Sequence, residues 1–190
     1  MIELIHHLNS IHPLSAEAVA ALIKVMRAKE LRRGQVWLQE GAVCDKLTFV
    51  VKGLLKLYFE TETKELVLQF ARENEFILSA QSYFVNTPSD YSIRAVDPSV
   101  VVSISKTDLQ FLLSRLPELS HHLLVVGQHQ INSLEHHSGL IMLPPRERFE
   151  KLVLAKSWLV DGKRITDKLL AGYLGVRANA VCEWRKEFKF

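Results

Sequence analysis

Residues 166–186, TDKLLAGYLGVRANAVCEWRK, have the pattern of two short helices joined by a tight turn. We expect the turn at Gly175, because glycine readily adopts the positive φ that such a turn needs. Ala171, earlier in the same stretch, is small enough to let the two helices cross closely. The apolar side chains that would bury the inner faces of both helices are Leu170, Leu174, Val176, Val181 and Trp184. The pattern predicts a helix-turn-helix, whose second helix can enter the major groove of DNA, although an ordinary helical hairpin has a similar sequence.

The second helix is predicted to run from about Arg177 to Glu187. Arg177 is an unusual residue to precede a helix, because Ser, Thr, Asp or Asn is preferred there. On the outer face, Ala178 can contact a thymine methyl group, Asn179 an adenine and Glu183 a cytosine. The candidates for contacts to phosphates are Arg177, Arg185, Lys186, Lys163 and Arg164.

The distribution of charge supports this hypothesis. The chain has 190 residues and a net charge of +3, yet residues 144–190 hold 11 Lys and Arg against 6 Asp and Glu. Residues 1–143 hold the other 13 basic and 15 acidic side chains and are therefore slightly acidic. A basic segment that coincides with the helix-turn-helix favours the phosphate backbone of DNA as its partner.

The part of the chain before this segment is rich in short β patterns. A helix is expected over residues 13–28, with Ser15 as its cap. Glycines at 34, 41 and 53 mark turns between strands. The strands are expected at residues 48–51, 55–59, 66–70 and 92–105. Many short strands with glycine turns predict a closed or double-layered β structure.

A long helix is predicted over residues 118–142, after a short one that ends before Pro117. Its apolar residues fall on two faces. One face holds Leu119, Leu123 and Val126, and the other holds Leu124, Ile131, Leu134 and Ile141. Both must be buried, so we expect one to pack on the β structure and the other on a second copy of the chain. Pro144 and Pro145 end this helix, a further helix follows over residues 146–159, and Asp161-Gly162 suggests a turn.

Several classes of protein are disfavoured. The chain has no apolar run of 18 residues that would cross a membrane, and its first residues do not resemble a signal peptide. Cys44 and Cys182 are too few and too far apart for a disulfide framework, a zinc site or an iron–sulfur cluster, and Cys44 is interpreted as a surface or core thiol. No catalytic motif is present. We therefore expect a cytoplasmic protein that is not an enzyme and has no cofactor or metal.

The order of these parts resembles the catabolite-activator/FNR family of bacterial transcription regulators. The stretches that carry the resemblance are residues 31–59, 73–77, 92–112 and 144–152 together with the helix-turn-helix. The resemblance implies an α+β fold with an N-terminal double-stranded β-roll of the jelly-roll kind, a central dimerisation helix and a C-terminal winged helix-turn-helix. The expected boundaries are 1–117 for the sensor domain, 118–143 for the central helix and 144–190 for the DNA-binding domain. The implied partners are double-stranded DNA, a second copy of the chain and a small-molecule effector.

The cyclic-nucleotide pocket of that family is expected to be degenerate here. The family uses a Gly-Glu pair that opens a short helix, followed by an arginine that holds the phosphate. Asn74 and Glu75 are matched to the pair, and Glu75 is interpreted as a solvent-exposed or capping residue. The arginine position falls in residues 88–91, where Asp90 would repel a phosphate and Tyr91 can fill the space. We therefore expect no response to cAMP. The alternative is a sensing or protein-interaction module of the same fold that has lost sequence-specific DNA binding.

Histidines are concentrated on the long helix. His122, His129 and His136 are spaced by seven residues and share one stripe. If this stripe faced a partner subunit, it would bring histidines together and create a response to pH or metal. A polar, solvated flank of the helix is the favoured interpretation.

Overall fold

The protein folds into two compact units, described here from a computed structural model for residues 1–161 and 163–188. The first unit comprises Met1–Leu57 and Phe70–Asn132, and the second comprises Tyr58–Gln69 and Ser133–Phe190. The division passes through the long central helix and the second sheet. The two units are defined by the density of contacts within each of them and not by function. The domain boundaries expected from the sequence, 1–117, 118–143 and 144–190, therefore remain predictions.

Two antiparallel sheets form the β-roll, in agreement with the predicted double-layered structure. The first sheet has the strand order β1-β8-β3-β6 and the second has the order β2-β7-β4-β5. The strands are β1 (Arg27–Leu31), β2 (Val36–Leu38), β3 (Lys46–Lys52), β4 (Leu55–Glu60), β5 (Glu65–Ala71), β6 (Phe76–Ile77), β7 (Ser92–Ala95) and β8 (Ser99–Ser105). The turn between β3 and β4 requires Gly53, which has a φ of 102° and lies against Ser99, where a Cβ would be 2.2 Å from Oγ.

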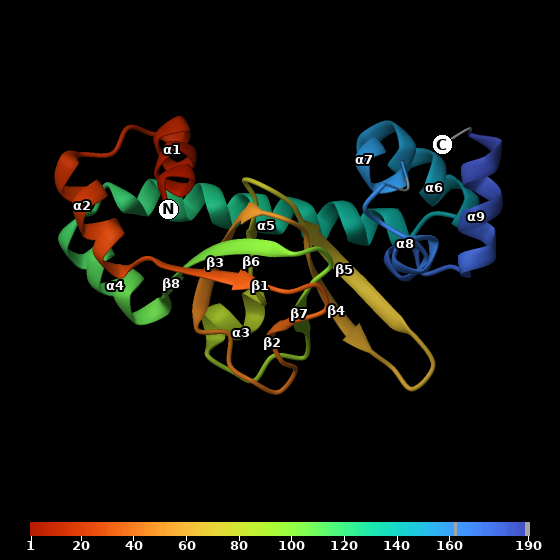
Figure 1. Ribbon diagram of the computed structural model, residues 1–190, viewed down its shortest axis with the longest axis horizontal. Coiled ribbons are helices and arrows are strands. Elements are labelled where there is room, and N and C mark those ends of the chain that lie inside the picture. Colours follow the sequence, from red (N-terminus) through yellow and green to blue (C-terminus); the bar gives the residue numbers. More distant parts are fainter. Residues whose placement is uncertain (162, 189–190) are drawn as a thin grey trace. The chain divides into compact units, whose positions relative to one another are not determined.

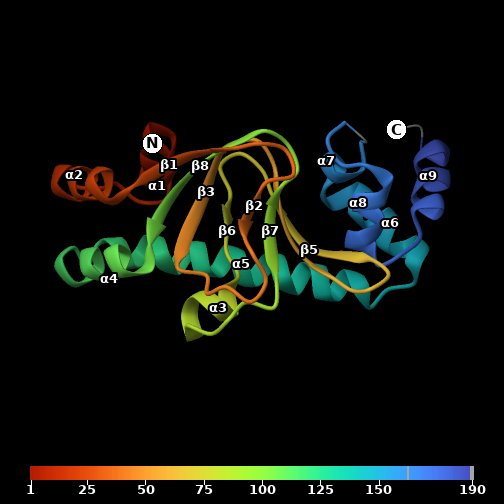
Figure 2. The ribbon, with the colours of Figure 1, turned by 60° about the horizontal axis from the view of Figure 1, so that its bottom comes forward.

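Helices cover the β-roll of the first unit. They are α1 (Ile2–Ile11), α2 (Ala16–Val25), α3 (Ala80–Val85), α4 (Lys106–Arg115) and the N-terminal part of α5 (Leu119–Ile141). Figures 1 and 2 show α1, α2 and α4 at the same end of the β-roll. Ser15 caps α2 as predicted, because its side chain accepts from the backbone N–H of Ala18 at 3.1 Å. The helix α1 was missed by the sequence reasoning, although Leu4, Ile5 and Leu8 form an apolar stripe that packs into the core.

The two apolar faces of α5 have different environments. Leu119 and Val126 are buried in the core cluster of the first unit, which also contains Phe49 and Phe76 from the first sheet. Leu124 and Ile131 on the other face are 60% and 57% exposed. This confirms that α5 uses one of its apolar faces within its own chain. None of the described helices, α5 included, is long and apolar enough to cross a membrane.

Four further helices make up the second unit together with the C-terminal part of α5 and the β4–β5 hairpin. They are α6 (Pro145–Ala155), α7 (Ser157–Val160), α8 (Asp167–Leu174) and α9 (Ala178–Glu187). The single helix predicted over residues 146–159 is interrupted at Lys156, where α6 ends and α7 follows. Between residues 145 and 188 the described part of the chain contains no strand, so the wing implied by the family resemblance is not seen there. A turn was also predicted at Asp161-Gly162, and Gly162 lies outside the described residues.

Candidate nucleic-acid interface and effector pocket

The helix-turn-helix predicted from residues 166–186 is present as α8 and α9, which pack against one another (Figure 2). Thr166 caps α8, and Gly175 ends it with a φ of 66° in the left-handed region. A Cβ at this glycine would meet the Nη1 atom of Arg148 at 3.3 Å, so both the conformation and the space favour glycine. These observations confirm the predicted position and cause of the turn.

One face of α9 is buried and the other is exposed. Val181 is buried, and Trp184 packs on Phe149 of α6 with ring centroids 5.5 Å apart. The candidate base-reading residues are arranged on the other side: Asn179 and Glu183 are exposed, and Ala178 is half-buried. Among the candidate phosphate contacts, Arg177, Lys186 and Lys163 are exposed. Arg177 is the N-cap residue of α9. Its side chain accepts no hydrogen bond from the backbone N–H groups of the described part of this helix, as expected for an arginine, which has no acceptor atom.

Arg185 requires a correction to the predicted set of phosphate contacts. Its side chain is buried beneath α9, where Nε donates to the carbonyl of Val160 at 2.9 Å and Nη2 donates to that of Ile165 at 2.8 Å. Nη1 forms an ion pair with Asp167. The guanidinium is thus occupied by internal partners that hold α7, the following loop and α8 to α9, and we assign it a structural role. Arg164, another predicted contact, is half-buried and also interacts within the protein.

Arg146, which the sequence reasoning did not single out, contacts the end of α9. Its Nη1 lies 2.6 Å from Glu187 at the end of α9, and its Nε lies 2.8 Å from Glu150. The guanidinium also lies over the ring of Trp184, 5.9 Å from the centroid. This clamp neutralises the carboxylate of Glu187, which would otherwise repel a phosphate. The spacing of Arg146 and Glu150 by one helical turn was the available sequence signal.

Two side chains of the second unit fix α8 to the end of α5. Arg148 donates to the carbonyls of Leu143 and Leu174, both at 2.7 Å. His137 Nε2 lies 2.8 Å from the carbonyl oxygen of Tyr173, and the two rings are 4.5 Å apart. A neutral imidazole with its proton on Nε2 satisfies this geometry as a donor. These contacts therefore connect the helix-turn-helix to this part of α5.

We expect this contact to make stability depend on pH. Burial is the main cause that lowers the pKa of His137 below 6.5, and Lys156 and His136 act in the same direction. Because the folded protein disfavours the charged ring, stability is fully present above pH 6.5 and is lost as the pH falls from there toward the folded pKa. The melting temperature should decrease when the pH is lowered from 7.5 to 5.5. The decrease should be smaller in His137→Gln, whose amide can still donate to the carbonyl of Tyr173. Burial also lowers the pKa of His136 and of His7, so some pH dependence should remain in this variant. An equal fall in both proteins would contradict the assignment.

The structure places Asn74 and Glu75 differently from the expected nucleotide pair. They lie in a tight turn before β6, in which Asn74 has a φ of 67° and Glu75 Oε2 accepts from the backbone N–H of Arg72 at 3.0 Å. Glu75 is therefore a capping residue of a turn, as the sequence interpretation held. The short helix that follows is α3, and the residues that open it are Leu78 and Ser79. Asn74 and Glu75 were therefore matched wrongly to the Gly-Glu pair of the family. That pair opens a short helix, whereas here the strand β6 lies between Glu75 and the helix α3.

A pair of buried hydroxyl groups stands at the opening of α3. Ser79 and Ser89 are 2% and 3% exposed, and their Oγ atoms are 2.8 Å apart. Ser89 Oγ also accepts from the backbone N–H of Tyr91 at 3.1 Å. Asp90 is exposed, and Tyr91 is half-buried. Ser79 thus lies at the opening of α3, where the resemblance implies a glutamate. Ser89 lies in the stretch where it implies an arginine. The two hydroxyl groups form a hydrogen bond with one another.

The histidine stripe on α5 does not share one environment. His122 is 3% exposed and lies against α1 and the α1–α2 linker, with Nε2 2.9 Å from the carbonyl oxygen of His12. His129 is exposed and His136 is half-buried. Spacing by seven residues drifts by about 20° per repeat on a straight helix, and packing on the β-roll separates the first ring from the others. Among the described residues no group of three or more His, Cys, Asp or Glu could hold a metal. Cys44 is a buried thiol whose pKa is raised by burial.

Comparison with known proteins supports the class suggested by this geometry. Residues 28–115 match the cyclic nucleotide-binding domain family. The probable transcriptional regulator flp of Lacticaseibacillus casei is 27% identical over 129 residues, which cover 67% of this chain but only 58% of that protein. The chain therefore spans less than two thirds of the length of this curated relative. A β-roll of the cyclic nucleotide-binding kind joined to a helix-turn-helix defines the class.

Solved structures share the fold of this chain. FixK2 from Bradyrhizobium japonicum has a TM-score of 0.76 and 13% identity, with 87% of this chain and 85% of that chain covered. The c-di-GMP responsive regulator CLP from Xanthomonas campestris has a TM-score of 0.69 and 17% identity, with 92% of each chain covered. The chain thus contains a cyclic nucleotide-binding-type domain and shares its fold with these regulators.

Proposed function

We propose that the protein is a DNA-binding transcription regulator that acts as a homodimer in the cytoplasm. The observation that carries this proposal is the exposed face of α9, which presents Asn179, Glu183 and Lys186 together on a helix held firmly by α6, α7 and α8. Asn179 and Glu183 are suited to base edges, and Ala178 to a thymine methyl group. Arg177, Lys186 and Lys163 are the proposed phosphate contacts, with Arg164 in a secondary position.

Two substitutions on α9 should separate base readout from phosphate binding. Asn179→Ala is expected to cost about 1–3 kcal/mol at the preferred site and to leave non-specific binding almost unchanged. Lys186→Ala is expected to weaken both kinds of binding alike and to lower the slope of log affinity against log salt by about 1. Gel-shift titrations at several salt concentrations, on a site obtained by binding selection, measure both effects. Lys24→Ala, an exposed lysine on α2, is the matched control and should change neither.

The alternative function is a sensing or protein-interaction module that no longer reads DNA. The uncapped start of α9 and the acidic Glu183 on its outer face fit this alternative. Binding selection decides between the two functions. Recovery of a two-fold symmetric motif supports the regulator, and failure to recover one at low salt supports the alternative.

We further propose that the β-roll does not respond to cAMP or cGMP. A buried phosphate needs a compensating cation, because an isolated buried charge is very costly. At the opening of α3, Ser79 and Ser89 supply hydroxyl groups that are already hydrogen-bonded to one another. Arg94 lies in β7, outside these two segments, and already interacts within the protein.

Isothermal titration with cAMP and with cGMP tests this proposal. We expect no saturable heat at nucleotide concentrations up to about a millimolar, and we expect the affinity for DNA to be the same with and without nucleotide. A cyclic nucleotide-binding protein titrated in the same buffer is the positive control. A dissociation constant in the micromolar range or tighter would contradict the proposal and would mean that a cation rearranges toward the phosphate.

A further inference from the structure

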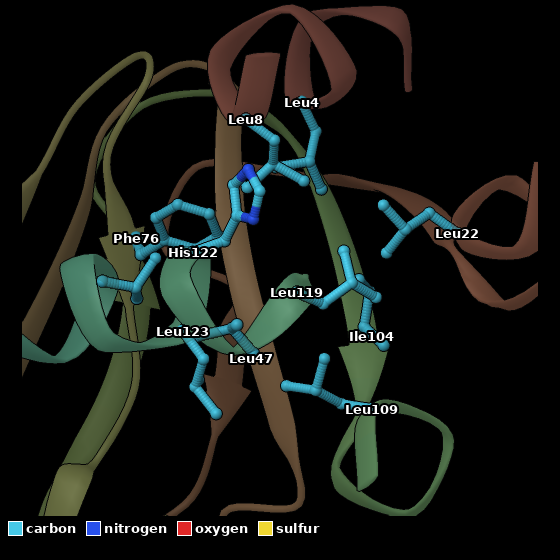
Figure 3. A pocket seen from close by; sticks show the side chains of 11 residues that line it. Leu4, Leu8, Leu22, Leu47, Phe76, Ile104, Leu109, Leu119, His122 and Leu123 are labelled. Carbon is cyan, nitrogen blue, oxygen red and sulfur yellow. The ribbon is translucent and has the colours of Figure 1, made fainter. Parts of the chain in front are cut away.

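A cavity of about 30 Å³ lies within the first unit, between the N-terminal helices, the first sheet and α5 (Figure 3). Its wall is formed by side chains of α1, α2, α4, α5, β3, β6 and β8. These side chains are Leu4, Leu8, Leu22, Leu47, Phe76, Ile104, Leu109, Leu119, His122, Leu123 and Val126. Protein interiors are close-packed and contain few voids larger than a water molecule, so a void at the junction of seven elements is a distinct feature.

The wall of the cavity is apolar. His122 is the polar residue among the described lining residues, and its Nε2 lies 2.9 Å from the carbonyl oxygen of His12, to which a neutral ring protonated on Nε2 can donate. No Lys, Arg, Asp or Glu occurs among the described residues of the wall. A buried water needs two to four polar partners, and a charged ligand needs a counter-charge, so this space suits neither.

The size of the cavity and the exposure of its wall restrict the ligand further. A single water-sized group requires roughly 10–15 Å³ of such space, so this cavity has room for about two or three. Ten of the lining residues are buried, and Leu123 is only half-buried. Leu123 is therefore the most exposed of the lining residues.

We propose that this cavity is a binding site for a small, uncharged, apolar molecule of about two or three heavy atoms, which enters past Leu123. Leu119, His122, Leu123 and Val126 all belong to α5, the helix whose other face carries the exposed Leu124 and Ile131. A bound molecule would press directly on this helix. Its role as an effector site rests on the proposed regulatory function.

Xenon is the probe for the binding step. In spectra of the ¹³C-labelled leucine methyl groups of the full-length protein, increasing xenon pressure should give saturable shifts at the lining leucines. Leu54 and Leu55 are buried but do not line the cavity, so their methyl groups should shift several-fold less. Absence of saturable shifts at the lining leucines would overturn the proposal, and so would equal shifts at all buried leucines.

Two substitutions at Leu123 should act in opposite directions. Leu123→Phe should fill the mouth of the cavity and reduce the xenon shifts, whereas Leu123→Ala should widen it and increase them. Ile23→Phe is the matched control, because Ile23 is 47% exposed, neighbours the lining residue Leu22 and does not itself line the cavity. Melting curves establish whether each variant is folded. If Leu123→Phe does not fold, the test rests on the increase in xenon shifts expected for Leu123→Ala. Shifts that are unchanged by Leu123→Ala would overturn the assignment of the site.

The effector role is tested separately by the affinity for DNA. Xenon should change this affinity at least about two-fold in the unmodified protein and in Ile23→Phe, and less in Leu123→Phe. Xenon shifts without any change in affinity would overturn the effector role. If the protein binds DNA neither with nor without xenon, the proposed function fails, and the xenon shifts still decide whether the cavity is a binding site.

Discussion

Replacing Ile131 by Glu is expected to convert the proposed dimer into monomers. Ile131 and Leu124 are spaced by two helical turns on the face of α5 that the first unit leaves exposed, at 57% and 60%. Exposed apolar side chains grouped in this way mark an interaction surface. In a two-fold dimer each glutamate would be buried next to its symmetry mate without a counter-charge, so the dimer dissociation constant should rise by about 100-fold or more.

Light scattering at micromolar concentration measures this change directly. Ile131→Leu keeps the apolar surface and should remain dimeric. Val126→Glu is not a suitable test of the interface, because Val126 is 4% exposed within the core of its own unit and the charge would unfold that core. If the unmodified protein is already monomeric at micromolar concentration, the proposed homodimer is wrong.

Replacing Arg185 by Ala should destabilise the second unit strongly and abolish DNA binding at every salt concentration. The substitution leaves the buried carbonyls of Val160 and Ile165 without their donor and leaves Asp167 without its cation. Losing one partner of a buried, hydrogen-bonded charge network costs roughly 3–5 kcal/mol. Arg185→Lys should recover only part of this loss, because a single ammonium group cannot reproduce the geometry of the guanidinium fork.

Thermal unfolding followed by circular dichroism measures this loss, with the exposed neighbour Lys186→Ala as the control. The control should melt close to the unmodified protein and differ only in its salt-dependent affinity for DNA. If instead Arg185→Ala melts at the temperature of the unmodified protein and lowers the slope of log affinity against log salt by about 1, Arg185 contacts a phosphate, as the sequence predicts.

Local patterns were sufficient where one or two neighbouring residues decide the conformation. Gly175 predicted the turn of the helix-turn-helix because few other residues adopt a positive φ there, and Ser15 predicted the start of α2 through its cap. The apolar periodicity of residues 118–142 predicted a helix with two faces to bury. Each of these features depends on residues within a turn or two of each other, so the sequence contains the whole cause.

Long-range contacts decided the rest. In sequence, Arg185 and Lys186 are equivalent basic residues on one helix, and only packing determines that the first is buried among carbonyls while the second is exposed. The sequence also does not show that Ser79 and Ser89 bind one another, because strand pairing and loop closure bring them together.

The sequence by itself determined the class of fold, the position of the helix-turn-helix and the presence of two apolar faces on α5. Only the tertiary structure decided which of these faces is exposed, which basic side chains are available to a phosphate, and that a small apolar cavity lies beside Leu123. The physical reason is that conformation and amphipathicity are local properties of the chain. Burial, hydrogen-bond satisfaction and voids arise only when segments distant in sequence pack together.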